Sequence, residues 1–301
     1  MNRPAKPAAK TTAAKTSSFA KARTRTVAKP SQDPASIVRM AAVQMASGPN
    51  VAANLAEAER LIGMAVAAGA QLVALPEYFA IMGMKDTDKV AARETPGKGP
   101  IQKFLAAQAR KHGIWLVGGS VPMACDNPKK VRNSCLVYDD KGKLVARYDK
   151  IHLFGLDLGT EHFKEQTTIE PGDTVVVVET PFGRIGLSIC YDLRFPELYR
   201  AMGDVDIILV PAAFTATTGK AHFETLVRAR AIENLAYVMA PAQVGKHSAN
   251  RQTFGNAMVV DPWGVVLARC ADGEGVCVAR FDRARLEKCR QELPALKHRK
   301  L

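Results

Sequence analysis

Apolar runs of strand length alternate with helix-length segments along most of this chain, and this alternation constrains the fold more than any other feature. Residues 37–45 predict a strand, and residues 50–69 predict an Ala-rich helix that ends at a glycine. The same pattern predicts strands at 70–77, 114–123, 205–214, 237–245 and 275–282, helices at 99–113, 221–236 and 283–293, and hairpins at 133–150, 174–190 and 256–270. This mixture predicts an α/β protein built in layers, with a mixed sheet arrangement.

The composition divides the chain into a basic tail, residues 1–36, and one domain, residues 37–301. The tail is rich in Ala, Lys, Thr, Ser and Pro without an apolar period, so we expect it to be disordered. It holds eight Lys or Arg against one acid and so carries +7 of the chain's formal net charge of +13. Organelle targeting and weak binding of polyanions are alternatives to a solvated extension. Beyond such weak contacts we expect no nucleic-acid partner.

Several function classes find no support in the sequence. No window of 18 or more consecutive apolar residues occurs, so we expect no membrane span. Neither GxGxxG nor GxxxxGK[ST] occurs, which argues against nucleotide chemistry. The six cysteines form no CxxC pair and the six histidines are scattered, so we expect no metal site. Because no apolar leader follows the basic charges, reduced thiols in a cytoplasmic protein are the interpretation we favour.

Cys190 is the first candidate for chemistry, in the segment RIGLSICYDLRFPELYR. It follows an apolar run and precedes Pro196 and Glu197, a pair typical of a helix start. A thiol between a strand end and a helix N-terminus lies in partial positive charge, which favours the reactive thiolate and stabilises an oxyanion. The alternative is an inert buried cysteine, the commoner fate of this residue type.

Glu77 and Lys150 also follow predicted strands. Glu77 comes after Pro76, where its side chain can project from the sheet edge as a general base. Lys150 lies in ARYDKIHLFG, among apolar and aromatic residues where an ammonium could hold an oxyanion. Taken singly, an exposed loop carboxylate and a surface lysine explain these two residues better.

Glu77, Lys150 and Cys190, in this order and each at a strand end, resemble the catalytic set of the nitrilase superfamily of carbon-nitrogen hydrolases. The resemblance runs from about Arg39 to the C-terminus and includes the segments CYDLRFPELYR, KIHLF, PAAFTATTGKAHFE, RARAIENLAYVMAPAQ and MVVDPWGVVLARC, which look like the Nit branch. The closing RQELPALKHRK is most similar to the deaminated glutathione amidases of that branch. The resemblance implies a four-layer α-β-β-α sandwich that assembles as a homodimer or larger homo-oligomer.

The resemblance also implies a role for each residue of the set. Cys190 is the nucleophile, Glu77 the general base, and Lys150 the oxyanion stabiliser together with the backbone N–H of Tyr191. A second catalytic glutamate is expected at Glu165, in HFKEQTTIEPGD. Attack on the amide carbon, departure of the amine and hydrolysis of a thioester then need neither a metal nor an organic cofactor.

The implied substrate is a small amide of a 2-oxo acid, with deaminated glutathione as the first candidate and 2-oxoglutarate and cysteinylglycine as its products. Arg194, on the turn after the nucleophile, can form a bidentate pair with the substrate carboxylate. The alternative for Arg194 is an ion pair with Asp192 or Glu197. Phe214 and Thr215, at the end of the next predicted strand, are expected to line the same pocket.

Other functions compete with this assignment. The same site could serve an ω-amidase acting on 2-oxoglutaramate or an N-carbamoyl amidohydrolase. A papain-type cysteine hydrolase would use His152 or His222 as its base. From another class, a non-enzymatic adaptor would bind polyanions through residues 1–36. The intact set of glutamate, lysine and cysteine argues against the adaptor as the main role.

Overall fold

The computed structural model describes residues 23–25, 38–159, 161–248, 251–270 and 272–300. Most of the predicted tail, residues 1–36, therefore lies outside the described residues. Its described part, Arg23–Arg25, forms the strand β1, which pairs in parallel with β10 (Val176–Thr180). In the part of the chain that is described, no helix is both long and apolar enough to span a bilayer.

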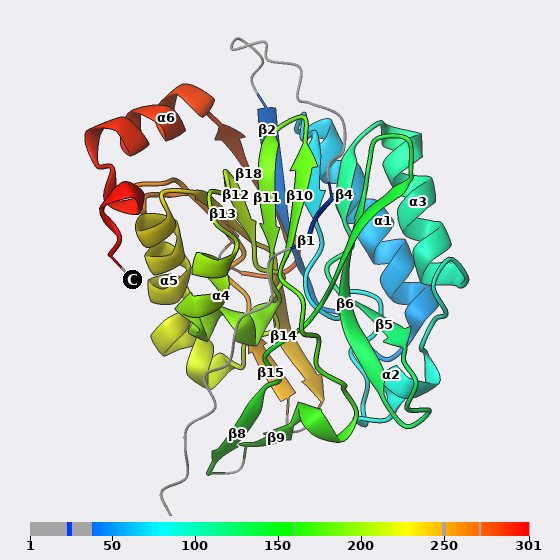
Figure 1. Ribbon diagram of the computed structural model, residues 1–301. Coiled ribbons are helices and arrows are strands. Elements are labelled where there is room, and N and C mark those ends of the chain that lie inside the picture. Colours follow the sequence, from blue (N-terminus) through cyan, green and yellow to red (C-terminus); the bar gives the residue numbers. More distant parts are fainter. Residues whose placement is uncertain (1–22, 26–37, 160, 249–250, 271, 301) are drawn as a thin grey trace, which may run out of the picture.

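Two mixed sheets form the centre of the molecule (Figure 1). The first sheet consists, in order, of β1, β10, β11 (Gly183–Leu187), β12 (Ile207–Leu209), β13 (Tyr237–Ala240), β16 (Met258–Val260) and β17 (Val266–Arg269). The second consists of β15 (Arg251–Phe254), β14 (Ala242–Ser248), β2 (Val38–Met45), β3 (Leu72–Ala74), β4 (Trp115–Val117), β6 (Val131–Tyr138) and β5 (Val121–Ala124). Two further strands join it, β18 (Gly275–Phe281) beside β2 and β7 (Leu144–Asp149) beside β6.

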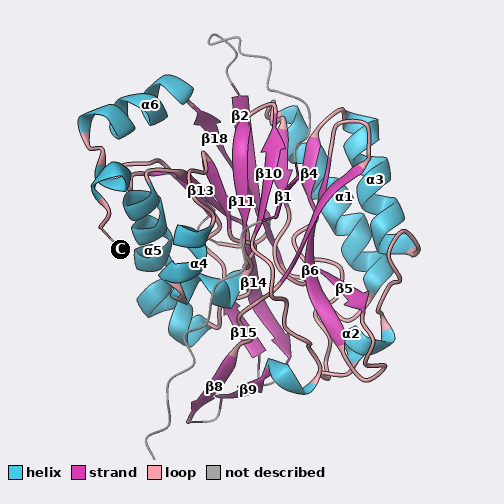
Figure 2. Cartoon of the chain, viewed as in Figure 1, coloured by secondary structure: helices cyan, strands magenta, loops and turns pink. Residues whose placement is uncertain are grey.

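Helices cover the outer faces of the sheets, which gives the expected α-β-β-α layer order (Figure 2). On the second sheet lie α1 (Val51–Ala67) and α3 (Pro100–His112), and over the first lie α4 (Pro196–Ala201) and α5 (Ala216–Asn234). The remaining helices are α2 (Asp88–Ala91), which is close to β5, and α6 (Arg283–Glu292), which follows β18. The predicted helices are therefore all present.

The apolar core explains why these elements pack in this order. Met40 of the second sheet and Ile185 of the first belong to one fully buried cluster, so the inner faces of the two sheets meet. Leu61 of α1 and Leu105 of α3 belong to another cluster with the outer face of the second sheet. Because alternate residues of a strand point to opposite faces, the buried strands need apolar residues on both sides, as their continuous apolar runs predicted.

Two predicted strands are wrong as single elements. Residues 237–245 contribute to β13 and β14, which belong to different sheets. The other is the predicted strand 114–123. It is divided into β4 and β5 at a pair of glycines. Gly119 has a φ of +39°, and a Cβ on it would overlap the carbonyl of Pro76. This close approach brings the Ser120 hydroxyl to the loop that carries Glu77, where it accepts a hydrogen bond of 2.9 Å from the Tyr78 N–H. The break in the strand thus supports the site.

A second difference is a hairpin that the sequence pattern did not predict. Strands β8 (Gly155–Leu158) and β9 (Glu161–Lys164) pair antiparallel and form a separate two-stranded sheet. Both strands have only four residues and are largely exposed, so no longer apolar run of the kind used for the prediction marks them. The hairpin leads directly into a 3-10 turn, η1 (Glu165–Thr167), and so delivers Glu165 to the site.

Candidate active site

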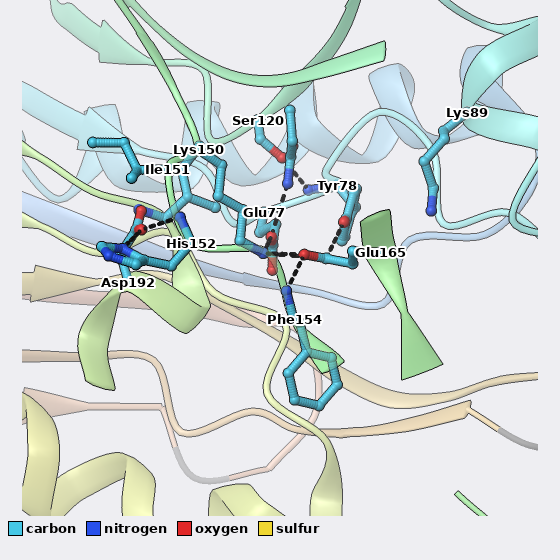
Figure 3. Close-up of polar contacts among 12 residues, drawn as sticks. Glu77, Tyr78, Lys89, Ser120, Lys150, Ile151, His152, Phe154, Glu165 and Asp192 are labelled. Carbon is cyan, nitrogen blue, oxygen red and sulfur yellow. Dashed lines mark hydrogen bonds and ion pairs between the residues drawn. The ribbon is translucent and has the colours of Figure 1, made fainter. Parts of the chain in front are cut away.

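The four residues predicted to be catalytic come from separate elements and meet at one end of the two sheets. Glu77 follows β3, Lys150 follows β7, and Glu165 begins η1. Cys190 begins a second 3-10 turn, η2 (Cys190–Arg194), which follows β11. Figure 3 shows Lys150 reaching toward Glu77 and Glu165 at the centre of this group.

Lys150 is the centre of the polar network. Its Nζ lies 2.8 Å from Glu77 Oε1, and 2.9 Å and 3.1 Å from the two carboxylate oxygens of Glu165. The Lys150 side chain has no exposed surface. Burial alone would lower the pKa of Lys150, but the charges of Glu165 and Glu77 outweigh it and raise this pKa well above its usual range. The lysine is therefore an ammonium in the resting site.

Glu165 is held as a carboxylate. It accepts hydrogen bonds of 2.6 Å from the Tyr78 hydroxyl and 2.7 Å from the Phe154 N–H. Burial would raise the pKa of Glu165, but the Lys150 charge and these hydrogen bonds together lower it. Glu165 therefore keeps a negative charge beside the lysine without taking its proton.

Glu77 and Cys190 form the second half of the network. Both residues line the same pocket, and Glu77 Oε1 accepts a hydrogen bond of 2.9 Å from the Asn133 amide. Burial raises the pKa of Glu77, and Lys150 offsets only part of this rise. A carboxylate with a raised pKa is a stronger base than an exposed glutamate, and Glu77 lines the same pocket as the thiol that it would deprotonate.

The expectation that the position of Cys190 favours its thiolate is wrong for the resting site. Burial, and then the negative charge of Glu77, raise the pKa of Cys190 well above its usual range. These effects outweigh any influence of the short turn that follows. Cys190 therefore rests as a thiol, and its proton must be removed by a neighbouring base during attack.

Two of the four non-glycine residues with positive φ in the described ranges lie in this site. Cys190 has φ +49° and Tyr78 has φ +58°, a conformation that costs free energy unless the surroundings fix it. The Cys190 N–H donates to the Pro211 carbonyl at 2.9 Å, and the Gln243 amide donates to the Glu77 carbonyl at 3.0 Å. These bonds hold Glu77 and Cys190 in their loops, where the backbone of Cys190 itself and of Tyr78, next to Glu77, has positive φ.

Asp192 fixes the turn that carries the nucleophile. Its buried carboxylate accepts hydrogen bonds from the Ile189 N–H at 2.8 Å, the His152 N–H at 3.0 Å and the Tyr148 hydroxyl at 2.7 Å. The His152 ring nitrogen Nδ1 lies 2.7 Å from the same carboxylate, and the ring stacks on Phe195. His152 is therefore engaged by Asp192 rather than by Cys190.

A pocket of about 420 Å³, part of it open to solvent, lies over these groups. Tyr191, Arg194, Phe214 and Thr215, the residues predicted to bind substrate, all line it. So do several residues that the sequence did not single out, namely Tyr78, Phe154, Phe163, Ala213, Thr218, Arg251 and Thr253. Tyr78 directly follows Glu77 and could have been inferred from that neighbour. Arg251 comes from a distant strand and left no local signal.

Among the described residues, Arg194 forms no ion pair with Asp192 or Glu197, which was the alternative to binding a substrate carboxylate. Its guanidinium lies over the rings of Tyr191 and Phe214, at 5.8 Å and 5.3 Å, and 3.4 Å from His222 Nδ1. The carboxylate of Asp192 is occupied as described above, and Glu197 makes no salt bridge with Arg194 within the described residues. The side chain is therefore available to the pocket, and His222 contacts Arg194 rather than Cys190.

The described residues contain no group of three or more His, Cys, Asp or Glu that could hold a metal ion. The arrangement supplies instead a thiol, an adjacent base and a buried ammonium. These are the parts needed for nucleophilic attack on a polarised carbonyl carbon and for stabilisation of the oxyanion that forms.

Comparison with known proteins gives consistent results. Residues 39–291 match the sequence profile described as carbon-nitrogen hydrolase. The chain is 43% identical over 265 residues to a deaminated glutathione amidase of Synechocystis sp., covering 86% of this chain and 97% of that protein. It is 40% identical over 268 residues to the deaminated glutathione amidase of Mus musculus, covering 87% and 83%. The crystal structure of Saccharomyces cerevisiae Nit3, a member of branch 10 of the nitrilase superfamily, superposes with a TM-score of 0.78 at 31% identity, covering 88% and 97%.

Proposed function

This chain belongs to the carbon-nitrogen hydrolase family, and from that premise we propose that it hydrolyses the amide bond of deaminated glutathione to 2-oxoglutarate and cysteinylglycine. The observation that carries the proposal is one pocket lined by the Cys190 thiol, the Glu77 carboxylate and Arg194, whose guanidinium has no carboxylate partner among the described residues. The relatives named as deaminated glutathione amidases support the choice of substrate.

Attack begins with a proton transfer from Cys190 to Glu77. As the sulfur bonds to the amide carbon, the carbonyl oxygen takes up negative charge, and the Lys150 ammonium and the Tyr191 N–H stabilise it. The Tyr191 N–H lies in the first turn of η2, where backbone N–H groups lack an intrahelical acceptor. Because Lys150 is already charged and buried, it needs no rearrangement at this step.

The carbon-nitrogen bond then breaks, and Glu77 returns the proton to the departing amine. A thioester between Cys190 and the 2-oxoglutaryl group remains. Glu77 next takes a proton from water as the water oxygen attacks the thioester carbon. When the carbon-sulfur bond breaks, this proton goes to the sulfur, and the starting thiol and carboxylate are restored.

Glu165 is a positioning residue in this scheme. It contacts Lys150 and Tyr78, and its negative charge keeps the lysine protonated and aimed at the site. Arg194 binds the carboxylate of the 2-oxo acid, because a guanidinium can bind a carboxylate through two hydrogen bonds. Phe214 and Thr215 form the wall beside it.

Assembly and location form a further part of the proposal. We expect a homodimer or larger homo-oligomer, which the exposed apolar side chains of Trp263, Val265 and Leu267, on and before β17, support. A cytoplasmic location is supported by the six free cysteines, since reduced thiols are typical of that compartment.

The test is the specificity constant of the purified protein on deaminated glutathione and on 2-oxoglutaramate, measured side by side with Cys190→Ala as the blank. A preference for deaminated glutathione that is lost in the variant supports the proposal. A preference for 2-oxoglutaramate would instead assign the protein as an ω-amidase. If neither substrate is turned over, the substrate proposal fails and only the assignment to the carbon-nitrogen hydrolase family stands.

A further inference from the structure

A second guanidinium lines the active-site pocket, and the mechanism does not use it. Arg251 begins β15, at the edge of the second sheet, and its guanidinium lies 5.3 Å from the centre of the Tyr78 ring. Tyr78 also lines the pocket, and so does Thr253, which lies two residues after Arg251 on β15. The side chain is thus placed in the site by packing on an aromatic ring.

Among the described residues, no carboxylate balances the charge of Arg251. No carboxylate forms a salt bridge with Arg251 or Arg194 within the described ranges. The two carboxylates that line the pocket, Glu77 and Glu165, are both bonded to Lys150. The pocket therefore presents two guanidiniums whose natural partners are anions brought by a ligand.

The two guanidiniums approach the pocket from different sheets. Arg194 stands on the turn after β11 of the first sheet and contacts the rings of Tyr191 and Phe214. Arg251 belongs to the second sheet and contacts the ring that follows Glu77 in the chain. One positive charge therefore lies on the turn of Cys190, and the other lies over the ring of Tyr78, the residue that follows Glu77.

This placement distinguishes the two ends of the substrate. Glu77 must reach the nitrogen of the departing amine in order to protonate it, so the amine lies on the Glu77 side of the scissile bond. Arg251, over Tyr78, is on that side, whereas Arg194 is close to the acyl end. In cysteinylglycine the terminal carboxylate lies at the far end of two residues, about 7 Å from the amine in an extended chain. A long arginine side chain can reach a carboxylate at that distance from the scissile bond.

We propose that Arg251 binds a carboxylate on the leaving-amine portion of the substrate, so that the site selects amides that carry an anion at both ends. This inference rests on the proposed function, in which that carboxylate is the terminus of cysteinylglycine. It also distinguishes this pocket from one built for 2-oxoglutaramate, whose leaving group is ammonia and offers nothing for Arg251 to bind.

The test compares deaminated glutathione with its C-terminal carboxamide, which differs only in the charge that Arg251 would bind. Three proteins are used, namely the wild type, Arg251→Gln, and Lys246→Gln as a control for charge. Lys246 is exposed, pairs with Gln252 across β14 and β15, and does not line the pocket. Its loss changes the local net charge by the same amount without removing a ligand contact.

We expect the wild type and Lys246→Gln to prefer the acid over the carboxamide by about 10- to 100-fold in kcat/KM, mainly because KM differs. This is the size of effect expected from hydrogen bonds to a charged group. In Arg251→Gln the preference should fall to within about twofold, since the remaining amide cannot distinguish the two termini. A wild type that does not discriminate, or an Arg251→Gln variant that keeps the full preference, would overturn the inference.

A binding measurement separates this inference from the proposed function. Dissociation constants of the acid and the carboxamide are measured by calorimetry on Cys190→Ala and on Cys190→Ala/Arg251→Gln, which cannot turn either over. Loss of discrimination in the double variant supports the role of Arg251 even if the wild type fails to hydrolyse deaminated glutathione. Hydrolysis of that substrate without any effect of Arg251 on binding would leave the proposed function intact and refute the inference.

Discussion

The Nζ of Lys150 lies 2.8 Å from Glu77 Oε1, and the two side chains are 0% and 1% exposed. In the proposed mechanism, Glu77 would therefore transfer protons beside a fixed positive charge that water does not screen. The same charge lowers the cost of keeping Glu77 ionised when burial favours its neutral form. The contact with Lys150 thus helps to keep Glu77 ionised, whereas burial is what raises the pKa of Glu77 and makes it a stronger base.

Replacing Glu77 with glutamine should abolish most of the activity while preserving the fold. The amide fills the same space but cannot take the Cys190 proton, and loss of a general acid-base group costs about 10²- to 10⁴-fold in rate. The measurement is kcat/KM on deaminated glutathione, with Glu59→Gln on the surface as the matched control. Near-normal activity in Glu77→Gln would mean that another group serves as base.

Replacing Lys150 with methionine should destabilise the protein. The change leaves Glu77 and Glu165 buried without their ammonium, and removing one partner of a buried ion pair costs about 3–5 kcal/mol in the free energy of unfolding. Urea denaturation would measure the loss. Lys111→Met is the control, since its salt bridge with Glu59 is exposed and should contribute less than about 1 kcal/mol. Equal effects of both changes would contradict this account of the network.

The pH dependence of activity should report the raised pKa of Glu77. Only the carboxylate can accept the Cys190 proton, so kcat/KM falls as the pH drops through this pKa. Because burial raises the pKa of Glu77 above the ordinary 4.5, we expect the acid limb of the profile to lie above pH 4.5. A limb at or below that value, in the wild type, would show that Glu77 is not the group that titrates.

The pH dependence of stability should report the pKa of Glu165, which is shifted downward, whereas the pKa of Glu77 is shifted upward. The Lys150 charge and the hydrogen bonds of Tyr78 and Phe154 lower the pKa of Glu165 below the ordinary 4.5 despite its burial. Its carboxylate therefore stabilises the folded state above the unfolded pKa, and this contribution is lost as the pH falls through the lower, folded pKa. In Glu165→Gln the acid-side decline in the free energy of unfolding should be shallower. An unchanged slope would argue against a lowered pKa.

Much of this site follows from the sequence because Glu77, Lys150 and Cys190 each come shortly after an apolar strand, whereas Glu165 follows the exposed strand β9. Strand ends on one side of a layered α/β protein converge, so Glu77, Lys150 and Cys190 could be expected to meet once their strands were recognised. The protonation state of Cys190 could not be predicted, because the effect of burial and of the Glu77 charge depends on distances that only the packed structure fixes.

Arg251 and the division of residues 114–123 show where the sequence pattern was insufficient. Arg251 reaches the pocket through the pairing of β15 with β14 at a sheet edge, a contact for which its own neighbours in the chain give no signal. The break at Gly118 and Gly119 lies inside a continuous apolar run, which periodicity reads as one strand. A glycine pair within a run indicates a bend, but not which loop approaches it.

Gly119→Ala tests whether this break supports catalysis. A Cβ at Gly119 would overlap the Pro76 carbonyl, and the backbone φ of +39° also disfavours alanine. We expect a loss of more than about 2 kcal/mol in the free energy of unfolding, because both overlap and backbone strain must be relieved. Since Ser120 would move, the hydrogen bond that it accepts from the Tyr78 N–H should weaken and kcat should fall as well.

Gly113→Ala is the matched control, because Gly113 has a φ of +60° with no atom within 4 Å of an added Cβ. That variant should lose about 1 kcal/mol and keep its kcat. If the two variants behaved alike, backbone strain alone would explain Gly119, and its contact with the Glu77 loop would have no catalytic consequence.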